Sequence, residues 1–126
     1  MRPEVATVAS AGSVTVDPAA LVQRQLDAYN AHDLAGFVAC YANDVELFRP
    51  PAAEPFIVGR AALAAHYGSR RFNIPSLNAE LVGRLVVGRR VFDHERITGL
   101  AEQPMEALVA FEVQDGLIRR VWFFGD

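Results

Sequence analysis

The amino-acid sequence predicts a single α+β domain, with helices from the first half of the chain packed on one face of a sheet formed mainly by the second half. Three observations support this fold class. The 126 residues, of which 52% are hydrophobic, suffice for one core and leave no room for a second. Apolar residues recur with a helical period in the segments before residue 72. After Pro75 they recur with a period of two.

Three helices are predicted in the first half of the chain. Asp17 followed by Pro18 is a typical helix start, because an N-cap acceptor precedes a proline at the first helical position. Asp33 caps a second helix, whose apolar spacing continues as far as Tyr41. The third helix covers roughly residues 60–71.

Strand signals follow the second helix and dominate the second half of the chain. A short alternating segment ends at a pair of prolines, and four longer ones are joined by turns. The last of these turns is the hairpin signal Asp115-Gly116. The predicted strands cover residues 45–49, 80–87, 91–98, 105–113 and 117–124. Because the last four are consecutive and closely linked, they should form an antiparallel meander.

The composition excludes several function classes. Twelve cationic side chains against fifteen carboxylates give a net charge of −3, so no excess of positive charge indicates a nucleic-acid partner. All twelve cations are arginines, and the absence of lysine excludes a Schiff-base mechanism. No apolar run approaches the roughly 18 residues needed to span a bilayer, so no membrane partner is expected.

Cysteine content and the N-terminal segment bear on localisation. A single cysteine, Cys40, excludes an internal disulfide and gives no evidence of an oxidising compartment. Residues 1–16 are rich in small side chains, but their apolar stretch is too interrupted for a secretory signal. We therefore expect a cytoplasmic protein with a flexible N-terminal tail at residues 1–16 and one domain at residues 17–126.

Three segments carry a family resemblance: YNAHDLAGFVACYANDVELFRP (Tyr29 to Pro50), IVGRAALAAHY (Ile57 to Tyr67) and FEVQDGLIRRVWFF (Phe111 to Phe124). In this order they resemble the nuclear transport factor 2-like superfamily, which includes ketosteroid isomerase, limonene epoxide hydrolase and the SnoaL-type polyketide cyclases. The resemblance implies a cone-shaped, curved antiparallel or mixed sheet. It also implies that the three helices pack on the concave face around one pocket.

The residues of the ketosteroid isomerase site are replaced in this chain. The resemblance puts Gln25 at the position of the family's oxyanion-donating tyrosine, Arg49 at its general base and Val109 at its second donor. Two supporting tyrosines of the family are matched by Tyr41 and Tyr67. Because a guanidinium cannot accept a proton, the resemblance implies the scaffold and the pocket but not steroid isomerisation.

The segment VFDHERIT, residues 91–98, holds the densest group of ionisable side chains. Alternation along a strand places His94 and Arg96 on one face and Asp93 and Glu95 on the other. Alignment with the family's apolar entry to this strand sends His94 and Arg96 into the pocket. The opposite register remains open, because a slip of one residue exchanges the faces. It would bring Asp93 and Glu95 toward Arg49, in a cluster similar to that of limonene epoxide hydrolase.

These patterns predict a protein that binds a small apolar or mildly anionic organic molecule. If it is an enzyme, we expect isomerase, lyase or hydrolase chemistry without a cofactor, with His94 carrying the proton and Arg49 stabilising negative charge. The alternative is a non-catalytic ligand-binding or dimerisation module of the same fold. No metal is expected, because the three histidines are dispersed. The expected ligand contacts are Gln25, Tyr41, Tyr67, Arg96, Val109 and Phe123.

A homodimer is predicted through the convex face of the sheet. Simple alternation along the last two strands directs Leu108, Ile118, Trp122 and Phe124 outward. Together they would form an exposed apolar patch of a kind that monomers rarely tolerate. Members of the superfamily that this chain resembles commonly pair through that surface.

Overall fold

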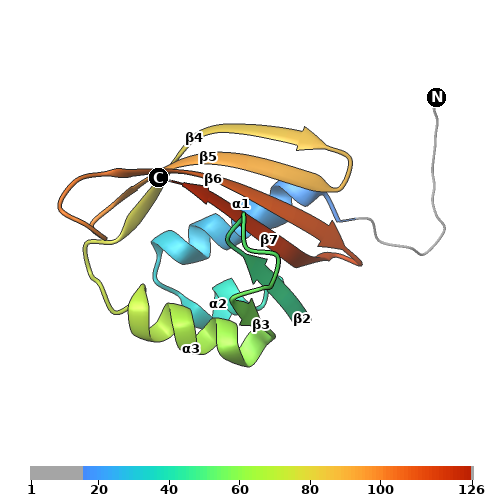
Figure 1. Cartoon of the computed structure of the whole chain (residues 1–126), viewed down its shortest axis with the longest axis horizontal. Coiled ribbons are helices and arrows are strands. Elements are labelled where there is room, and N and C mark those ends of the chain that lie inside the picture. Colours follow the sequence, from blue (N-terminus) through green and yellow to red (C-terminus); the bar gives the residue numbers. More distant parts are fainter. Residues whose placement is uncertain (1–15, 126) are drawn as a thin grey trace.

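A computed structural model describes residues 16–125, which form a curved sheet with three helices on its concave side (Figure 1). The predicted α+β class is confirmed. A flexible tail was predicted for residues 1–16, and all of these except Val16 lie outside the described residues. In chain order the elements are α1 (Pro18–Asn30), α2 (Leu34–Val38), β2 (Tyr41–Phe48), β3 (Ile57–Val58), α3 (Arg60–Arg70), β4 (Asn78–Val87), β5 (Arg90–Thr98), β6 (Met105–Gln114) and β7 (Leu117–Gly125).

The sheet has six strands in the order β3-β2-β7-β6-β5-β4. The predicted meander is present, since β4, β5, β6 and β7 pair antiparallel in sequence order. The strand β2 joins the meander by parallel pairing with β7, which makes the sheet mixed. Figure 1 shows the sheet curving over the helices, so that its concave face and the helices enclose the core.

The second helix is shorter than its apolar spacing predicts. Helix α2 ends at Val38, and Tyr41 already belongs to β2, where it pairs with Ile118. The backbone N–H of Ile118 donates to the Cys40 carbonyl at 2.9 Å. Sheet hydrogen bonding therefore takes over three residues after the helix, although side chains as far as Tyr41 follow a helical period. The predicted N-cap of this helix is present, because Asp33 accepts a hydrogen bond from the backbone N–H of Gly36 at 3.0 Å.

An irregularity in the pairing of β6 with β7 turns one side chain of the predicted dimer patch to the opposite face of the sheet. Glu112 pairs with Arg120, but Val113 pairs with Ile118, so Arg119 is an extra residue in β7. Simple alternation fails at this point, and Ile118 turns inward to become fully buried. The prediction that Ile118 lies on the convex face is therefore wrong. Leu108, Trp122 and Phe124 do lie on that face, where Leu108 pairs with Phe124 across the strands.

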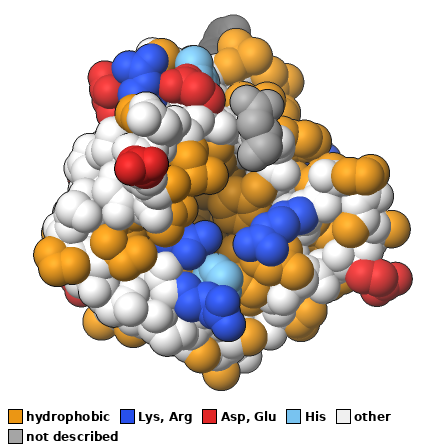
Figure 2. Space-filling model, turned by 60° about the vertical axis from the view of Figure 1, so that its left-hand side comes forward, with side chains coloured by type: hydrophobic (Ala, Val, Ile, Leu, Met, Phe, Trp, Pro, Cys, Tyr) orange, Lys and Arg blue, Asp and Glu red, His pale blue; other side chains and the backbone are white. Residues whose placement is uncertain are grey.

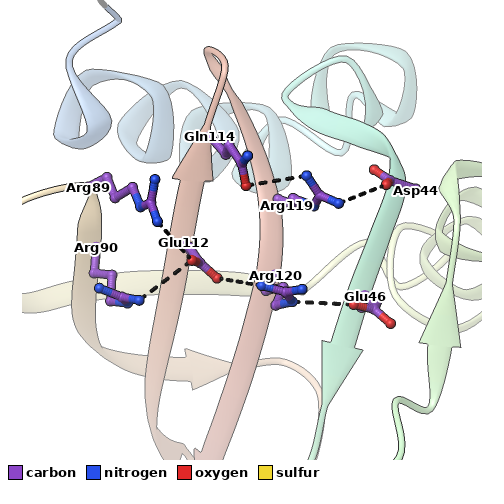
Figure 3. Close-up of polar contacts among 8 residues, drawn as sticks. All are labelled: Asp44, Glu46, Arg89, Arg90, Glu112, Gln114, Arg119 and Arg120. Carbon is purple, nitrogen blue, oxygen red and sulfur yellow. Dashed lines mark hydrogen bonds and ion pairs between the residues drawn. The ribbon is translucent and has the colours of Figure 1, made fainter.

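The convex face also carries a ladder of charged side chains that crosses four strands (Figure 3). Glu112 is only 4% exposed, yet it lies within ion-pair distance of Arg90 and Arg120, at 3.6 and 3.3 Å. Arg120 in turn pairs with Glu46 of β2 at 3.3 Å. Opposite charges on neighbouring strands stabilise this register.

Two glycines with positive φ provide a matched test of how the link after β5 is packed. Gly99 (φ +84°) lies against the segment before β4, and a Cβ atom there would be 2.1 Å from the carbonyl oxygen of Ser76. Gly88 (φ +60°) is in the β4–β5 turn with no atom near its Cβ position.

We predict that Gly88→Ala lowers the free energy of unfolding by about 1 kcal/mol. Gly99→Ala should lower it by about 3 kcal/mol or more, because backbone must also move. Urea unfolding measures both, and equal losses would contradict the packing argument.

Candidate functional site

A cavity of about 360 Å³ lies between the helices and the concave face of the sheet. Figure 2 looks into it and shows hydrophobic side chains lining the hollow, with arginine and histidine side chains at its rim. Most of its wall is aliphatic or aromatic, and a few polar groups interrupt it, which is the usual composition of a small-molecule site. The polar and ionisable side chains of the wall are Gln25, Tyr29, Tyr41, Arg49, His66, Tyr67, Arg71, Glu95 and Glu106.

The structure places six of the eight predicted site residues in the wall of this cavity. They come from α1, β2, α3, β6 and β7 and from the segment after β2. These residues are Gln25, Tyr41, Arg49, Tyr67, Val109 and Phe123. Their proximity follows from the topology, because the parallel pairing of β2 with β7 brings the two halves of the chain together around one space.

His94 and Arg96 do not lie in the cavity, so the predicted register of β5 is wrong. Asp93 and Glu95 face inward and are 0% and 7% exposed, whereas the side chains of His94 and Arg96 are 47% and 46% exposed. On the convex face both are bound to Glu106, and Arg96 Nε donates to its Oε2 at 2.8 Å. The pairing of β5 with β6 fixes this orientation, since Asp93 lies opposite the inward-facing Val109.

Asp93 is held by a buried ion pair with Arg84 of the neighbouring strand. The guanidinium binds the carboxylate with two hydrogen bonds, from Nε at 2.7 Å and from Nη2 at 2.9 Å. Its third side, Nη1, donates to Gln23 Oε1 of α1 at 3.0 Å. Burial alone would make an ionised Asp93 costly, and this two-pronged contact compensates the cost. The contact also ties α1 to the edge of the sheet.

Glu95 lies two residues further along the same face of β5 but has no hydrogen-bond or ion-pair partner among residues 16–125. Burial raises the pKa of its carboxyl group from 4.5 to about 7, the negative charge of Asp93 adds to this rise, and Arg84 opposes it. At neutral pH the group is therefore present in both protonation states. Glu95 belongs to the register that the sequence left open as the alternative.

Three tyrosines surround the inner part of the cavity. Burial raises the pKa of Tyr29 to about 12 and also raises those of Tyr41 and Tyr67, so all three hydroxyl groups stay protonated. Tyr41 donates to Gln25 Oε1 at 3.1 Å, and the amide of Gln25 donates to the Val22 carbonyl at 3.1 Å. These two predicted ligand contacts therefore satisfy each other. The hydroxyl groups of Tyr29 and Tyr67 have no partner within the described part of the chain, which leaves them able to donate to a bound molecule.

The outer part of the cavity carries positive charge. The guanidinium carbon of Arg49 lies 3.9 Å from the ring centre of Phe56, and Arg71 and His66 line the same opening. The pKa of His66 is lowered, first by burial and then by the charges of Arg71 and Arg49. Sequence reasoning assigned no role to Arg71 or His66, because only the bend after α3 brings Arg71 back to this opening.

Within residues 16–125 no group of three His, Cys, Asp or Glu side chains is placed to hold a metal ion. No helix in that range is long and apolar enough to cross a membrane.

The fold and the cavity define a class of small, cone-shaped α+β domains that bind small molecules. The sequence pattern of the SnoaL-like domain matches residues 22–121, most of the chain. The chain therefore belongs to the SnoaL-like family, within the nuclear transport factor 2-like superfamily, and the predicted resemblance is confirmed. The SnoaL-like fold is that of a small-molecule-binding family.

Solved structures agree with this assignment. A candidate ketosteroid isomerase from Kribbella flavida is 26% identical with a TM-score of 0.74, and the alignment covers 86% of this chain and 77% of that one. A SnoaL-like protein of unknown function from Burkholderia thailandensis is 22% identical with a TM-score of 0.73, covering 86% and 93%. A cystatin-fold protein from Novosphingobium aromaticivorans is 17% identical with a TM-score of 0.79, covering 87% and 99%. No curated protein matches the chain.

The raised pKa of Glu95 predicts a specific pH dependence of stability. Because the pKa of about 7 in the folded state exceeds the model-peptide value of 4.5, protonation of this carboxyl stabilises the fold below pH 4.5, and the stabilisation is lost as the pH rises through 7. We predict that the free energy of unfolding of wild type falls by about 3 kcal/mol relative to Glu95→Gln between pH 4 and pH 8. Urea unfolding at both pH values measures the difference.

The control for this measurement is Glu80→Gln, on the exposed side of β4. It should show a much smaller change over the same pH range. If the difference in free energy of unfolding between wild type and Glu95→Gln were the same at both pH values, the pKa of Glu95 would not be raised by folding. Water would then reach this carboxyl group.

Proposed function

We propose that this protein binds a small organic molecule, apolar or mildly anionic, in the concave cavity and transfers a proton on it without a cofactor. Glu95 is the proposed acid and base, in place of the predicted His94. The observation that carries the proposal is a buried, unpartnered carboxyl group in the cavity wall whose pKa is about 7. A general base is most effective when its pKa lies near the working pH.

The groups around Glu95 support proton transfer at a carbon next to a carbonyl group. When the base removes such a proton, negative charge develops on the carbonyl oxygen and needs hydrogen-bond donors. The hydroxyl groups of Tyr67 and Tyr29 are free to donate to that oxygen, and the charge of Glu95 reaches both of them. Isomerisation and elimination both use this step, and in a hydrolysis the same base would take its proton from the attacking water.

Steroid isomerisation is not part of the proposal, although the Kribbella flavida protein carries that description. In this chain Arg49 and Val109 stand where the resemblance expects the base and the second donor. The base proposed here is on β5 and approaches the cavity from another wall. The reacting carbon of a substrate would therefore lie at a different place in the pocket.

The test is exchange of carbon-bound hydrogen in deuterated water, followed by NMR over a panel of small aryl ketones and β-keto esters. We predict that wild type exchanges the acidic hydrogen of at least one compound, with a rate that rises with pH through about 7 as Glu95 ionises. Glu95→Gln should lower the rate by about 10²-fold or more, and Glu80→Gln should not. Binding without exchange would leave the non-catalytic ligand-binding module as the function.

The second part of the proposal is a homodimer formed through the convex face of the sheet. The convex apolar patch consists of Phe48, Leu108, Trp122 and Phe124, and Phe48 stacks on Trp122 at 5.7 Å between ring centres. Leu108 and Phe124 are each 43% exposed, which is unusual for large apolar side chains on a sheet face. The charged ladder of Figure 3 lies beside this patch and could form the polar rim of an interface.

Leu108→Glu should convert the dimer into a monomer, because dimerisation would have to bury its carboxylate among apolar side chains. Ala61→Glu, on the exposed side of α3, is the matched control and should leave the dimer intact. Sedimentation equilibrium of the three proteins distinguishes the states. Monomeric wild type at high micromolar concentration would contradict this part of the proposal.

A further inference from the structure

The cavity carries opposite kinds of polar group at its two ends. Glu95 lies in the buried inner part, next to the fully buried Asp93. Arg49 and Arg71 lie at the outer opening, which Figure 2 shows as a hollow with basic side chains around its rim. The wall between the two ends is apolar, and includes Ile97, Leu100, Met105, Ala107 and Phe123. This arrangement can distinguish the two ends of an elongated ligand.

Arg49 and Arg71 are among the arginines that have no carboxylate partner within residues 16–125. Six others, Arg84, Arg89, Arg90, Arg96, Arg119 and Arg120, each form an ion pair. Neither Arg49 nor Arg71 forms one with any residue in the range 16–125. Arg71 Nη1 donates a hydrogen bond to the backbone carbonyl of Arg70 at 2.8 Å, and the other N–H groups of its guanidinium remain available.

Aromatic packing holds Arg49 at the opening rather than in open solvent. Its guanidinium lies over Phe56, whose ring contacts both His66 and Phe123 at about 6 Å between centres. Stacking of this kind fixes the plane of a guanidinium while its N–H groups point outward from the edge. Both guanidiniums line the cavity together with His66 and Tyr67, and their charges act on both of these side chains.

The carboxylate of Glu106 also borders the opening, but it does not neutralise this pair. His94 and Arg96 bind its two oxygens from the convex side of the sheet. Its charge is therefore compensated there, and the opening keeps an excess of positive charge from Arg49 and Arg71.

We propose that Arg49 and Arg71 bind the carboxylate of an amphipathic organic anion, whose apolar body extends inward so that its uncharged end reaches Glu95. The inference rests on the proposed function and adds the class and the orientation of the substrate. Two guanidiniums offer the paired N–H donors that carboxylates prefer. The reverse orientation is unfavourable, because it would bury the ligand's negative charge beside Glu95 and Asp93.

The test compares three ligands of one shape: phenylbutyrate, phenylbutanamide and phenylbutylamine. We expect wild type to bind the carboxylate about tenfold more tightly than the amide, and the amine most weakly, in calorimetric titrations at low salt. Arg49→Gln and Arg71→Gln should each remove part of this preference, and the double variant should bind carboxylate and amide equally. Arg89→Gln, on the convex face, is the matched control and should behave as wild type.

His66 supplies an independent readout. Arg49 and Arg71 lower the pKa of its imidazole, so a carboxylate bound between them should raise that pKa again. NMR titration should show an upward shift of the His66 pKa with phenylbutyrate and none with phenylbutanamide.

Equal affinity for the carboxylate and the amide in wild type would overturn the anion site, as would an unchanged preference in the double variant. The proposed function would survive that result if the amide still binds and if Glu95→Gln still lowers hydrogen exchange. Failure of all three ligands to bind at millimolar concentration would overturn the anion site and the small-molecule pocket together.

Discussion

The ion pair between Arg84 and Asp93 is the contact on which the arrangement of the site depends. Asp93 is fully buried, and an ionised carboxylate in that position costs several kcal/mol unless a partner compensates it. Arg84 compensates it with two hydrogen bonds, and thereby fixes which face of β5 meets the helices. A slip of one residue would bury His94 and Arg96 instead, away from the carboxylate of Glu106 that now binds both. The pair also occupies Arg84, whose charge acts on Glu95, and Glu95 has no ion-pair partner within residues 16–125.

Much of the fold could be predicted because local signals and tertiary packing agree. The N-caps Asp17 and Asp33 both accept backbone hydrogen bonds as expected, and the four alternating segments became β4 to β7 with small changes at their ends. The errors occur where pairing between distant strands overrides a local pattern. Tyr41 continues a helical period but is drawn into β2 by β7, and an extra residue in β7 turns Ile118 into the core. Neither event has a signal in a short window of sequence.

The site was predictable only in part, for a related reason. Residues such as Tyr41, Tyr67 and Val109 were placed by resemblance in spacing, and they do line the cavity. The direction of β5 could not be decided in that way, because Val91 and Phe92 make both faces begin with an apolar residue. The deciding partner, Arg84, is nine residues away on another strand, and a single sequence does not show that the two side chains meet. Arg71 and His66 were missed because no local pattern marks the mouth of a cavity.

Separating the unpaired carboxyl group from the unpaired arginines has a chemical consequence. Had Arg49 or Arg71 contacted Glu95, the ion pair would have held the carboxylate ionised and kept its pKa low. Neither arginine forms an ion pair with Glu95, so burial dominates instead, and the pKa of Glu95 stays near 7. The arginines remain free to hold a ligand, and the carboxyl group remains free to exchange a proton with it. The aromatic ring of Phe37 packs against Tyr29, Tyr41 and Tyr67 and holds these rings in the cavity wall. The apolar wall between the two ends is therefore what would let one pocket serve the proposed proton transfer and the proposed anion binding without mutual neutralisation.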